Sequence, residues 1–188
     1  PLREQFYKDN PLPKWVPQVE GPLLVVMGGS QGAQGINSVF YESLEFLLNK
    51  QFRIVHIIGE CNSFNSKTMK SKNYVQKKFT NQIAALMQNC HLVISRSGSG
   101  TINELIKTNK PSILIPYPNS KKNHQEKNAM ILASIGGAIL INQKQISKAF
   151  FEENLARIFK SNKGKNQYEV LDLMTKNMKN YNPKDSIN

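Results

Sequence analysis

Small residues and one acidic side chain gather in a segment that could hold a phosphorylated ligand. Residues 95–101 read Ser-Arg-Ser-Gly-Ser-Gly-Thr, and Glu104 follows three positions later. At the start of a helix, the backbone N–H groups of Ser99, Gly100 and Thr101 would carry partial positive charge, which favours an anion such as a diphosphate. Glu104 could accept the two hydroxyl protons of a ribose diol. A glutamate at this position could equally cap the helix or lie on its surface.

A second glycine-rich segment, residues 28–33, reads Gly-Gly-Ser-Gln-Gly-Ala and follows an aliphatic run. Its glycines permit a tight turn that exposes backbone N–H groups to an anion. The spacing does not fit the dinucleotide fingerprint, and the lysine of a P-loop is missing, which argues against a kinase or NTPase. From the residues alone, an anion site and a tight turn without a ligand both stay open.

A third polar segment spans residues 116–129, where prolines lead into a predicted helix that begins with His124 and Gln125. Gln125 and Asn128 are three positions apart and would share one helix face. Side-chain amides both donate and accept hydrogen bonds, as sugar hydroxyls require. Polar helix starts are common, so this segment alone carries little weight.

Alternating strands and helices must position these three segments. The pattern predicts buried strands at 23–27, 53–58, 91–95, 112–116 and 138–141. It predicts helices at 34–49, 82–89, 101–109, 124–134, 147–159 and 167–179, and makes no assignment for 63–79. The fold class is therefore α/β, with a Rossmann-like, doubly wound parallel sheet. Ligands bind such sheets at the carboxyl ends of the strands, where all three segments would lie.

The overall composition narrows the class of protein. The chain has 188 residues and a net charge of +12, but only four of its 25 basic residues are arginines, which is a weak footprint for nucleic acid. We therefore expect no nucleic-acid partner. No apolar run approaches the roughly 20 residues of a membrane-spanning helix. Cys61 and Cys90 form no recognisable metal motif and are too few for a disulfide framework.

The distribution of prolines suggests how the chain is divided. Four prolines fall within residues 1–20, which predicts an extended lead-in or interdomain linker. The folded domain is expected at 21–180 and a frayed tail at 181–188. Because the sequence opens on Pro1-Leu2-Arg3, without methionine, we expect it to be a piece of a longer protein.

Taken together, three ordered motifs resemble a known family. They are G-G-S-Q-G-A-x-x-x-N at 28–37, S-R-S-G-x-x-T-x-x-E-L at 95–105 and H-Q-x-x-N-A at 124–129. In this order and spacing they resemble the C-terminal, donor-binding domain of the MurG family, bacterial transferases that add N-acetylglucosamine to lipid I and so make lipid II. His56 and Gly59 also match the family pattern, and Pro1-Leu2-Arg3 resembles its interdomain junction.

The resemblance implies half of a GT-B enzyme that inverts the anomeric centre and uses UDP-N-acetylglucosamine without a metal or other cofactor. Lipid I would bind through an N-terminal domain that is absent from these residues and would hold the general base. The catalytic residues would therefore lie outside this chain, which should bind donor without turnover. The family's setting implies a cytoplasmic protein, peripheral on the inner face of an anionic plasma membrane.

The resemblance also implies a role for individual residues. Ser30 and Gln31 would approach the diphosphate or sugar, while Ser99, Gly100 and Thr101 would surround the phosphates. Glu104 would hold the ribose hydroxyls, and Arg3 would lie near the diphosphate or the uracil edge. Backbone around Phe79 and Thr80 would read uracil. His124, Gln125 and Asn128 would face the N-acetylglucosamine, although some relatives have glutamine in place of His124.

Three other functions remain open at this stage. The soluble subunit of the eukaryotic dolichol-linked N-acetylglucosamine transferase resembles the same domain but binds donor beside a separate membrane protein. A related glycolipid synthase moves galactose onto diacylglycerol and should differ most in the third motif. A basic nucleic-acid binder would show steep salt dependence and indifference to UDP.

Overall fold

A parallel β-sheet forms the centre of the computed structural model, which describes residues 2–28, 34–62, 71–160 and 168–181. In these residues the sheet has six strands in the order β3-β2-β1-β4-β5-β6. The strands are β1 Leu23–Met27, β2 Arg53–Ile57, β3 Tyr74–Lys77, β4 Leu92–Ser95, β5 Ser112–Leu114 and β6 Ala138–Leu140. All neighbouring strands pair in parallel. This is the strand order of Rossmann-type sheets, so the predicted fold class is confirmed.

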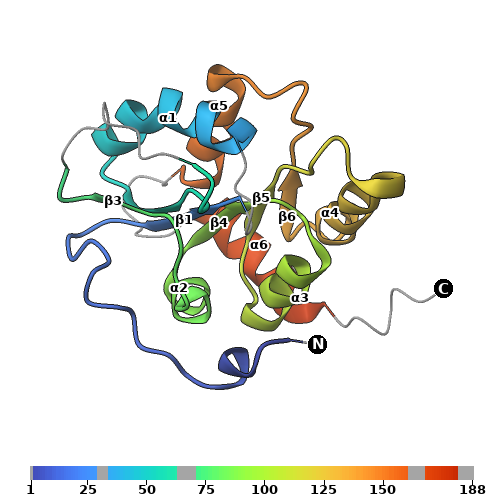
Figure 1. Ribbon diagram of the computed structural model, residues 1–188, viewed down its shortest axis with the longest axis horizontal. Coiled ribbons are helices and arrows are strands. Elements are labelled where there is room, and N and C mark those ends of the chain that lie inside the picture. The colour runs from blue at the N-terminus through green and yellow to red at the C-terminus, as the bar shows by residue number, and fades with distance from the viewer. Residues whose placement is uncertain (1, 29–33, 63–70, 161–167, 182–188) are drawn as a thin grey trace.

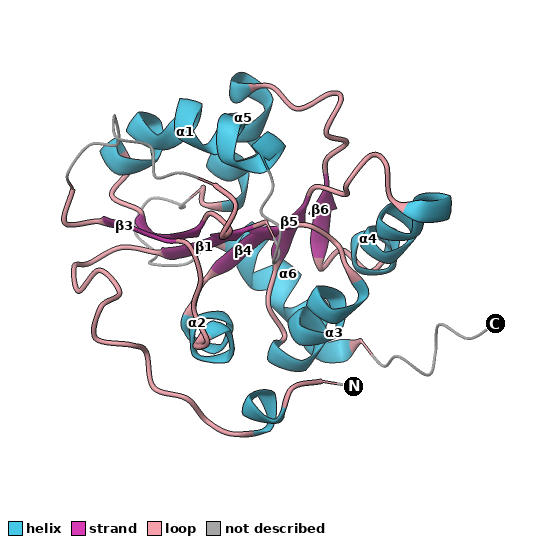
Figure 2. Ribbon diagram, in the orientation of Figure 1, coloured by secondary structure: helices cyan, strands magenta, loops and turns pink. Residues whose placement is uncertain are grey.

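Helices cover both faces of the sheet (Figure 1). Helices α1 Gln34–Asn49 and α5 Lys148–Ile158 lie on one face. Helices α2 Ile83–Asn89, α3 Ser99–Thr108 and α4 His124–Ser134 pack against the other. The last helix, α6 Glu169–Asn180, contributes Leu171 and Met174 to the core on the α1 and α5 face, and Met178 to the core on the face of α2, α3 and α4. Figure 2 shows the resulting three layers by secondary structure.

The alternation of side chains along each strand explains why both faces need a cover. In β1, Leu23, Val25 and Met27 pack into the core beneath α2, α3 and α4, while Leu24 and Val26 pack into the core beneath α1 and α5. Successive side chains of a strand point to opposite faces. A strand that is apolar at every position therefore has to be buried from both sides, as in parallel sheets.

The predicted elements agree with the observed ones to within two residues at each end. The one strand without a prediction is β3, which lies in the polar segment 63–79. All four of its residues are only partly buried because it pairs solely with β2, at the edge of the sheet. Helix α3 begins at Ser99, two residues before the predicted start.

The proline-rich lead-in packs along the α2 and α3 side of the domain (Figure 1). It contains a short 3₁₀ helix, η1 Glu4–Tyr7. Phe6 and Val16 are buried in the core of this side, at 2% and 1% exposed. The Trp15 indole donates a hydrogen bond to Gln82 Oε1 at 2.7 Å. Within the described residues, no helix is long and apolar enough to cross a membrane.

Candidate donor-binding site

The carboxyl ends of β1, β4 and β5 bring the three polar segments to one edge of the sheet. Met27 pairs with Ser95, and Ser95 pairs with Leu114, so these strands end at the same level. From β1 the chain continues to β2 and β3 on one side of the sheet, and from β4 it continues to β5 and β6 on the other side. The sheet therefore has a topological switch point between β1 and β4, and Rossmann-type sheets bind ligands in the crevice at such a point. Ser30 and Gln31, predicted to contact the ligand here, lie outside the described residues.

The N-terminus of α3 presents backbone donors beside open space. Gly98 is its N-cap, in an extended conformation, and no side chain caps the helix. The first intrahelical bond runs from the Ile102 N–H to the Gly98 carbonyl at 3.0 Å, so the N–H groups of Ser99, Gly100 and Thr101 have no acceptor within the helix. A Cβ atom added at Gly98 or Gly100 would meet nothing within 4 Å. This end of α3 can therefore accept an anion.

Glu104, one turn into α3, is 8% exposed and forms an ion pair with Arg3 of the lead-in. Arg3 Nε and Nη2 lie 3.1 and 2.6 Å from Glu104 Oε1. The helix also uses the Glu104 carbonyl, which accepts a bond from the Thr108 hydroxyl at 2.8 Å. Two residues predicted to bind the nucleotide thus contact each other although 101 positions separate them.

The first turn of α4 is bonded to the loops that follow β4 and β5. The Ser97 hydroxyl donates to the Gln125 carbonyl at 2.7 Å, and Asn128 Nδ2 donates to the Ser97 carbonyl at 3.0 Å. Gln125 Oε1 accepts the Tyr117 N–H at 2.9 Å. Among the described residues, Gln125 Nε2 and Asn128 Oδ1 have no partner. Each amide therefore holds a loop with one atom and has its other atom unpaired among the described residues.

His124 occupies the first position of α4 and is exposed. It follows η2 Lys121–Asn123, in which Lys122 and Asn123 both adopt the left-handed conformation, with φ of 49° and 56°. Non-glycine residues seldom adopt this conformation, and two in succession define a sharp turn into α4. The turn brings His124 to the same helix end as Gln125.

Arg96, between β4 and α3, has a structural role. Its Nη1 donates to the carbonyls of Ile115 and Pro116 at 2.9 and 3.1 Å, and its guanidinium lies 5.6 Å from the centre of the Tyr117 ring. Burial lowers the pKa of Arg96 from its usual range. The guanidinium therefore holds the exit of β5 against the end of β4, in a place where it is largely shielded from water.

A groove of about 480 Å³ runs between α3 and α4. Its lining includes Ser99 and Asn128, together with the apolar side chains of Ile102, Ile106 and Ile131. The groove thus places a predicted phosphate-binding residue and a predicted sugar-binding residue on one continuous surface.

Phe79 and Thr80 follow β3 and precede α2. Phe79 is 62% exposed, and the buried Thr80 hydroxyl accepts the Gln82 N–H at 3.1 Å. Because β3 lies two strands from β1, these residues sit at the outer part of the same edge. Among the described residues, no hydrogen bond or ion pair joins them to Arg3 or Glu104, and their role in reading uracil remains a prediction.

A buried histidine supports the start of α1. His56 on β2 is fully buried, with Nε2 3.0 Å from Asn37 Oδ1 and Nδ1 3.1 Å from the Tyr74 hydroxyl. Asn37 Nδ2 donates to the Ile58 carbonyl at 3.1 Å, so its Oδ1 accepts from an Nε2–H and Tyr74 donates to Nδ1. Burial lowers the pKa of His56 to about 3, which keeps the imidazole neutral. Two residues of the sequence motifs, Asn37 and His56, are thus structural.

The chemistry of the site is that of anion and hydroxyl recognition. Among the described residues, no group of three or more His, Cys, Asp or Glu side chains could hold a metal ion. The first turns of α3 and α4 supply helix N–H donors, one carboxylate that is paired with Arg3, and two amides. Of their residues, Ser99 and Asn128 line the groove between the two helices, whereas Arg3, Glu104 and Gln125 do not. This set matches the parts of a nucleoside diphosphate sugar, whose phosphates accept hydrogen bonds and whose hydroxyls do both.

Fold and sequence together define the class of protein. The glycosyltransferase family 28 C-terminal domain matches residues 23–183, and the chain belongs to this family. Its fold is that of the C-terminal half of GT-B glycosyltransferases, and the crystal structure of Acinetobacter baumannii MurG matches 87% of this chain and 47% of its own, with a TM-score of 0.63 at 21% identity. The glycosyltransferase SnogD from Streptomyces nogalater matches 90% of this chain and 42% of its own, with a TM-score of 0.62 at 18% identity.

Closer relatives by sequence come from Prochlorococcus marinus. The UDP-N-acetylglucosamine--N-acetylmuramyl-(pentapeptide) pyrophosphoryl-undecaprenol N-acetylglucosamine transferase of subspecies pastoris is 73% identical over 190 residues, covering 100% of this chain and 52% of the relative. The transferase of the same name in strain MIT 9301 is 75% identical over 184 residues, covering 96% of this chain and 50% of the relative. The chain thus spans about half the length of these relatives.

Proposed function

We propose that this chain is the donor-binding half of a transferase that moves N-acetylglucosamine from UDP-N-acetylglucosamine to lipid I, forming lipid II. The observation that carries the proposal is the uncapped N-terminus of α3 at the switch point of the sheet, with Glu104 one turn further along the helix. The relatives that match the whole chain at 73% and 70% identity carry the name of this transferase.

The phosphates would bind at the start of α3. Three N–H groups, from Ser99, Gly100 and Thr101, lack helix acceptors, and each charge interaction with a helix terminus contributes about 0.3–1 kcal/mol at exposed sites. Several donors aimed at one diphosphate stabilise the negative charge that grows on UDP as it leaves. These donors need no metal to act, and we therefore include metal-independent binding in the proposal.

The sugar would lie against the first turn of α4. Gln125 Nε2 can donate to a sugar hydroxyl or to the acetyl carbonyl, and Asn128 Oδ1 can accept from a hydroxyl. Their other amide atoms bond to backbone, which fixes the orientation of both side chains. The exposed His124 and the predicted contacts of Ser30 and Gln31 would complete this part of the site.

The reaction would be an inverting displacement. The acceptor hydroxyl oxygen attacks the anomeric carbon, the bond from that carbon to UDP breaks, and UDP leaves with the bonding electrons. The hydroxyl proton passes to a general base, which we assign to the other half of the protein, together with lipid I binding. The residues of this chain would bind and orient the donor and stabilise the leaving group.

Calorimetry on the 188-residue chain tests the proposal. We expect UDP and UDP-N-acetylglucosamine to bind in the presence of EDTA, and ADP-glucose to bind at least about tenfold more weakly. A folded sample that binds neither uridine ligand would contradict the proposed function. Binding that disappears with EDTA and returns with Mg²⁺ would contradict only its metal independence.

A non-catalytic subunit of a dolichol-linked transferase would bind the same donor. The two functions differ in what precedes the donor-binding domain, and an acceptor domain encoded in the same reading frame would exclude the subunit. We favour the transferase because the relatives that cover this entire chain are about twice its length and are named as transferases to an undecaprenol-linked acceptor.

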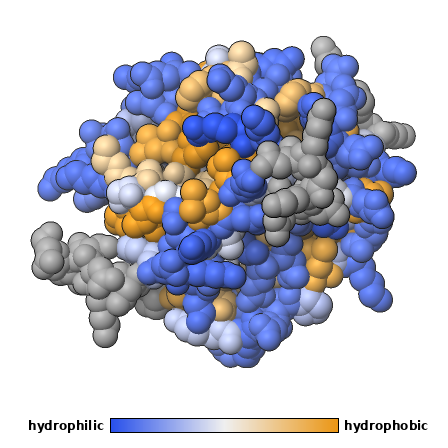
Figure 3. Space-filling view, turned by 180° about the vertical axis from the view of Figure 1, so that it is seen from behind, coloured by the Kyte–Doolittle hydropathy of each residue, from blue (hydrophilic) through white to orange (hydrophobic). Residues whose placement is uncertain are grey.

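We also propose that the protein acts at the cytoplasmic face of an anionic membrane, where a lipid-linked acceptor resides. The net charge of +12 supports this proposal, since basic surfaces are attracted to anionic lipids. Figure 3 shows hydrophilic side chains over most of the far side of the molecule, interrupted by an area of apolar side chains.

A further inference from the structure

The ion pair between Arg3 and Glu104 joins the lead-in to the residue that we propose for ribose. Arg3 directs two donors, Nε and Nη2, at a single carboxylate oxygen, Oε1. Among the described residues, no hydrogen bond or ion pair reaches Glu104 Oε2. A carboxylate offers about two lone-pair positions on each oxygen. Arg3 therefore occupies the positions of Oε1 and leaves those of Oε2 for two further donors.

Arg3 is held in place by its own neighbours. Its carbonyl accepts the Phe6 N–H at 3.0 Å, at the start of η1, and its guanidinium lies 5.4 Å from the centre of the Phe6 ring. Phe6 is anchored in the core. The side chain of Arg3 remains 48% exposed while that of Glu104 is 11% exposed, so the pair is open to solvent from the Arg3 side.

The basic residue of α3, Lys107, contacts another side chain. Lys107 lies three positions beyond Glu104, but its Nζ sits 4.7 Å from the centre of the Tyr7 ring. In the described part of the chain, Arg3 is the only residue that forms an ion pair with Glu104. The orientation of the buried carboxylate thus depends on a residue of the lead-in.

We propose that Arg3 is a positioning residue for ribose recognition, acting through Glu104 and not by contact with the phosphates or uracil. This inference rests on the proposed function. Arg3 holds Oε1 and so orients Oε2 to accept the 2′- and 3′-hydroxyl protons. Loss of Arg3 therefore lowers the affinity for a ligand most where Glu104 contributes most to that affinity. The preference for ribose over deoxyribose falls as a result.

A double-mutant cycle with two ligands tests this role. UDP and 2′-deoxy-UDP are titrated into wild type, Arg3→Ala, Glu104→Gln and the double variant. We expect wild type to prefer UDP, and Arg3→Ala to weaken UDP about tenfold while changing 2′-deoxy-UDP less than about threefold. In the Glu104→Gln background, Arg3→Ala should change UDP affinity less than about twofold.

Matched variants separate this effect from folding and from net charge. Lys8→Ala also removes a lead-in cation that forms an ion pair at 2.6 Å, with Glu4, and should leave both affinities unchanged. Arg3→Lys keeps the charge but cannot direct two donors from one planar group, and should show a smaller loss with the same preference for UDP. If thermal unfolding shows that Arg3→Ala is not folded, Arg3→Lys takes its place in the cycle.

Other outcomes overturn the inference in distinct ways. Equal losses for both ligands that persist in the Glu104→Gln background would place Arg3 on the phosphates or the base. Tighter UDP binding by Arg3→Ala would mean that Arg3 competes with ribose. Failure of folded wild type to bind UDP would contradict the proposed function itself and would overturn this inference with it.

Discussion

The buried imidazole of His56 links one residue's protonation state to the stability of the fold. It accepts from Tyr74, donates to Asn37 and lies against the Phe40 ring, with centres 4.6 Å apart. Burial raises the pKa of Tyr74, so its hydroxyl stays protonated and can donate. A second imidazole proton would have to displace the hydrogen that Tyr74 donates to Nδ1, and burial disfavours the resulting charge.

We predict that acid destabilises the domain through His56. Its pKa is lowered to about 3 in the folded state, against about 6.5 in an unfolded chain. The unfolded state therefore binds the proton first, and stability that is complete above pH 6.5 falls by up to about 1.4 kcal/mol per pH unit between 6.5 and 3. Urea unfolding between pH 7.5 and 5 measures this slope.

The control for this prediction is His56→Gln, which should lower stability at pH 7.5 but flatten its dependence on pH. Some dependence should remain, since burial, Arg53 and Lys110 lower the pKa of His91 as well. His91 Nδ1 accepts the Leu23 N–H at 3.0 Å, which requires the neutral ring. Identical slopes of stability against pH for wild type and variant would contradict this prediction, because they would show that the pKa of His56 is the same in the folded and unfolded states.

At the scale of elements, the N-terminus of α3 has glycines that the fold itself does not require. Gly98 has φ of −60°, and Gly100 lies within the helix, so neither needs a left-handed backbone. A Cβ atom would fit at both positions. Glycine lowers helix stability by roughly 1 kcal/mol relative to alanine. At Gly100, inside the first turn, this cost is explained best by a ligand that approaches the backbone, whereas Gly98 is the N-cap, a position at which glycine is favoured over alanine.

We predict that Gly100→Ala separates stability from binding. The variant should be as stable as wild type or up to about 1 kcal/mol more stable, because alanine favours the helix and reduces the freedom of the unfolded chain. UDP affinity should fall by roughly tenfold, because the new methyl group occupies the space of a phosphate. Urea unfolding and calorimetry on one preparation measure both. Unchanged affinity would argue against phosphate binding at this helix end.

Gly21, which precedes β1, should give the opposite pattern. It has φ of +119°, and a Cβ atom there would lie 2.2 Å from the Gln51 carbonyl oxygen. Gly21→Ala should therefore lower the free energy of unfolding by about 1–3 kcal/mol. UDP affinity of the folded fraction should not change, because Gly21 lies at the amino ends of the strands. A change in affinity without a change in stability would contradict this division between the two ends of the sheet.

The sequence predicted the elements of this fold better than the contacts of the site. Runs such as Leu23–Met27 are apolar at every position because both faces are covered, and that pattern is visible in the sequence. Strand β3 was missed because its partly buried residues alternate too weakly. The contact between Arg3 and Glu104 could not be predicted, since no local pattern relates residues 101 positions apart.

For the whole molecule, we propose that the lead-in is part of the folded unit. Besides the burial of Phe6 and Val16, the Gln88 side chain accepts from the Asn10 N–H and donates to the Lys8 carbonyl, at 3.0 and 2.8 Å. Phe6→Ala should cost about 3 kcal/mol of stability, whereas Tyr7→Ala, at a side chain 63% exposed, should cost about 1 kcal/mol or less. Equal, small losses in urea unfolding would mean that the lead-in detaches freely.

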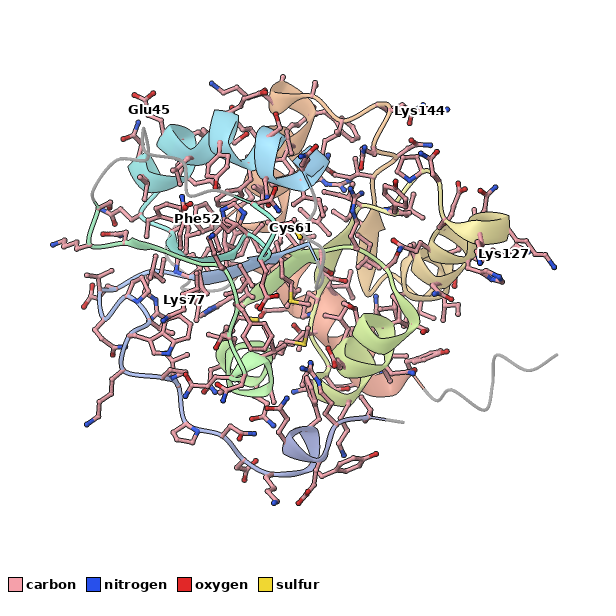
Figure 4. All side chains as sticks on the ribbon, viewed as in Figure 1. Glu45, Phe52, Cys61, Lys77, Lys127 and Lys144 are labelled. Carbon is pink, nitrogen blue, oxygen red and sulfur yellow. The ribbon has the colours of Figure 1, made fainter. Side chains whose placement is uncertain are left out.

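The net charge of +12 belongs to the surface of the molecule and not to the proposed pocket. Arg96 donates hydrogen bonds to two backbone carbonyls, and Arg3 is paired with Glu104. Figure 4 places Lys77 on the opposite side of the molecule from Lys127 and Lys144, and Lys77 packs over the Trp15 ring. A dispersed charge of this kind attracts an anionic surface without forming a defined site, and salt screens the attraction within about 10 Å at 0.1 M.

This distribution predicts salt-sensitive membrane association that is independent of donor binding. The chain should co-sediment with vesicles containing about one third anionic lipid at low salt and be released by about 0.5 M NaCl, because each basic residue near the surface contributes about 1 kcal/mol before screening. UDP affinity should change less over the same range, since its donors are backbone N–H groups and amides at short range. Vesicles of neutral lipid are the control. Equal binding to neutral vesicles, or binding that survives high salt, would mean that apolar side chains and not the lysines hold the chain at the membrane.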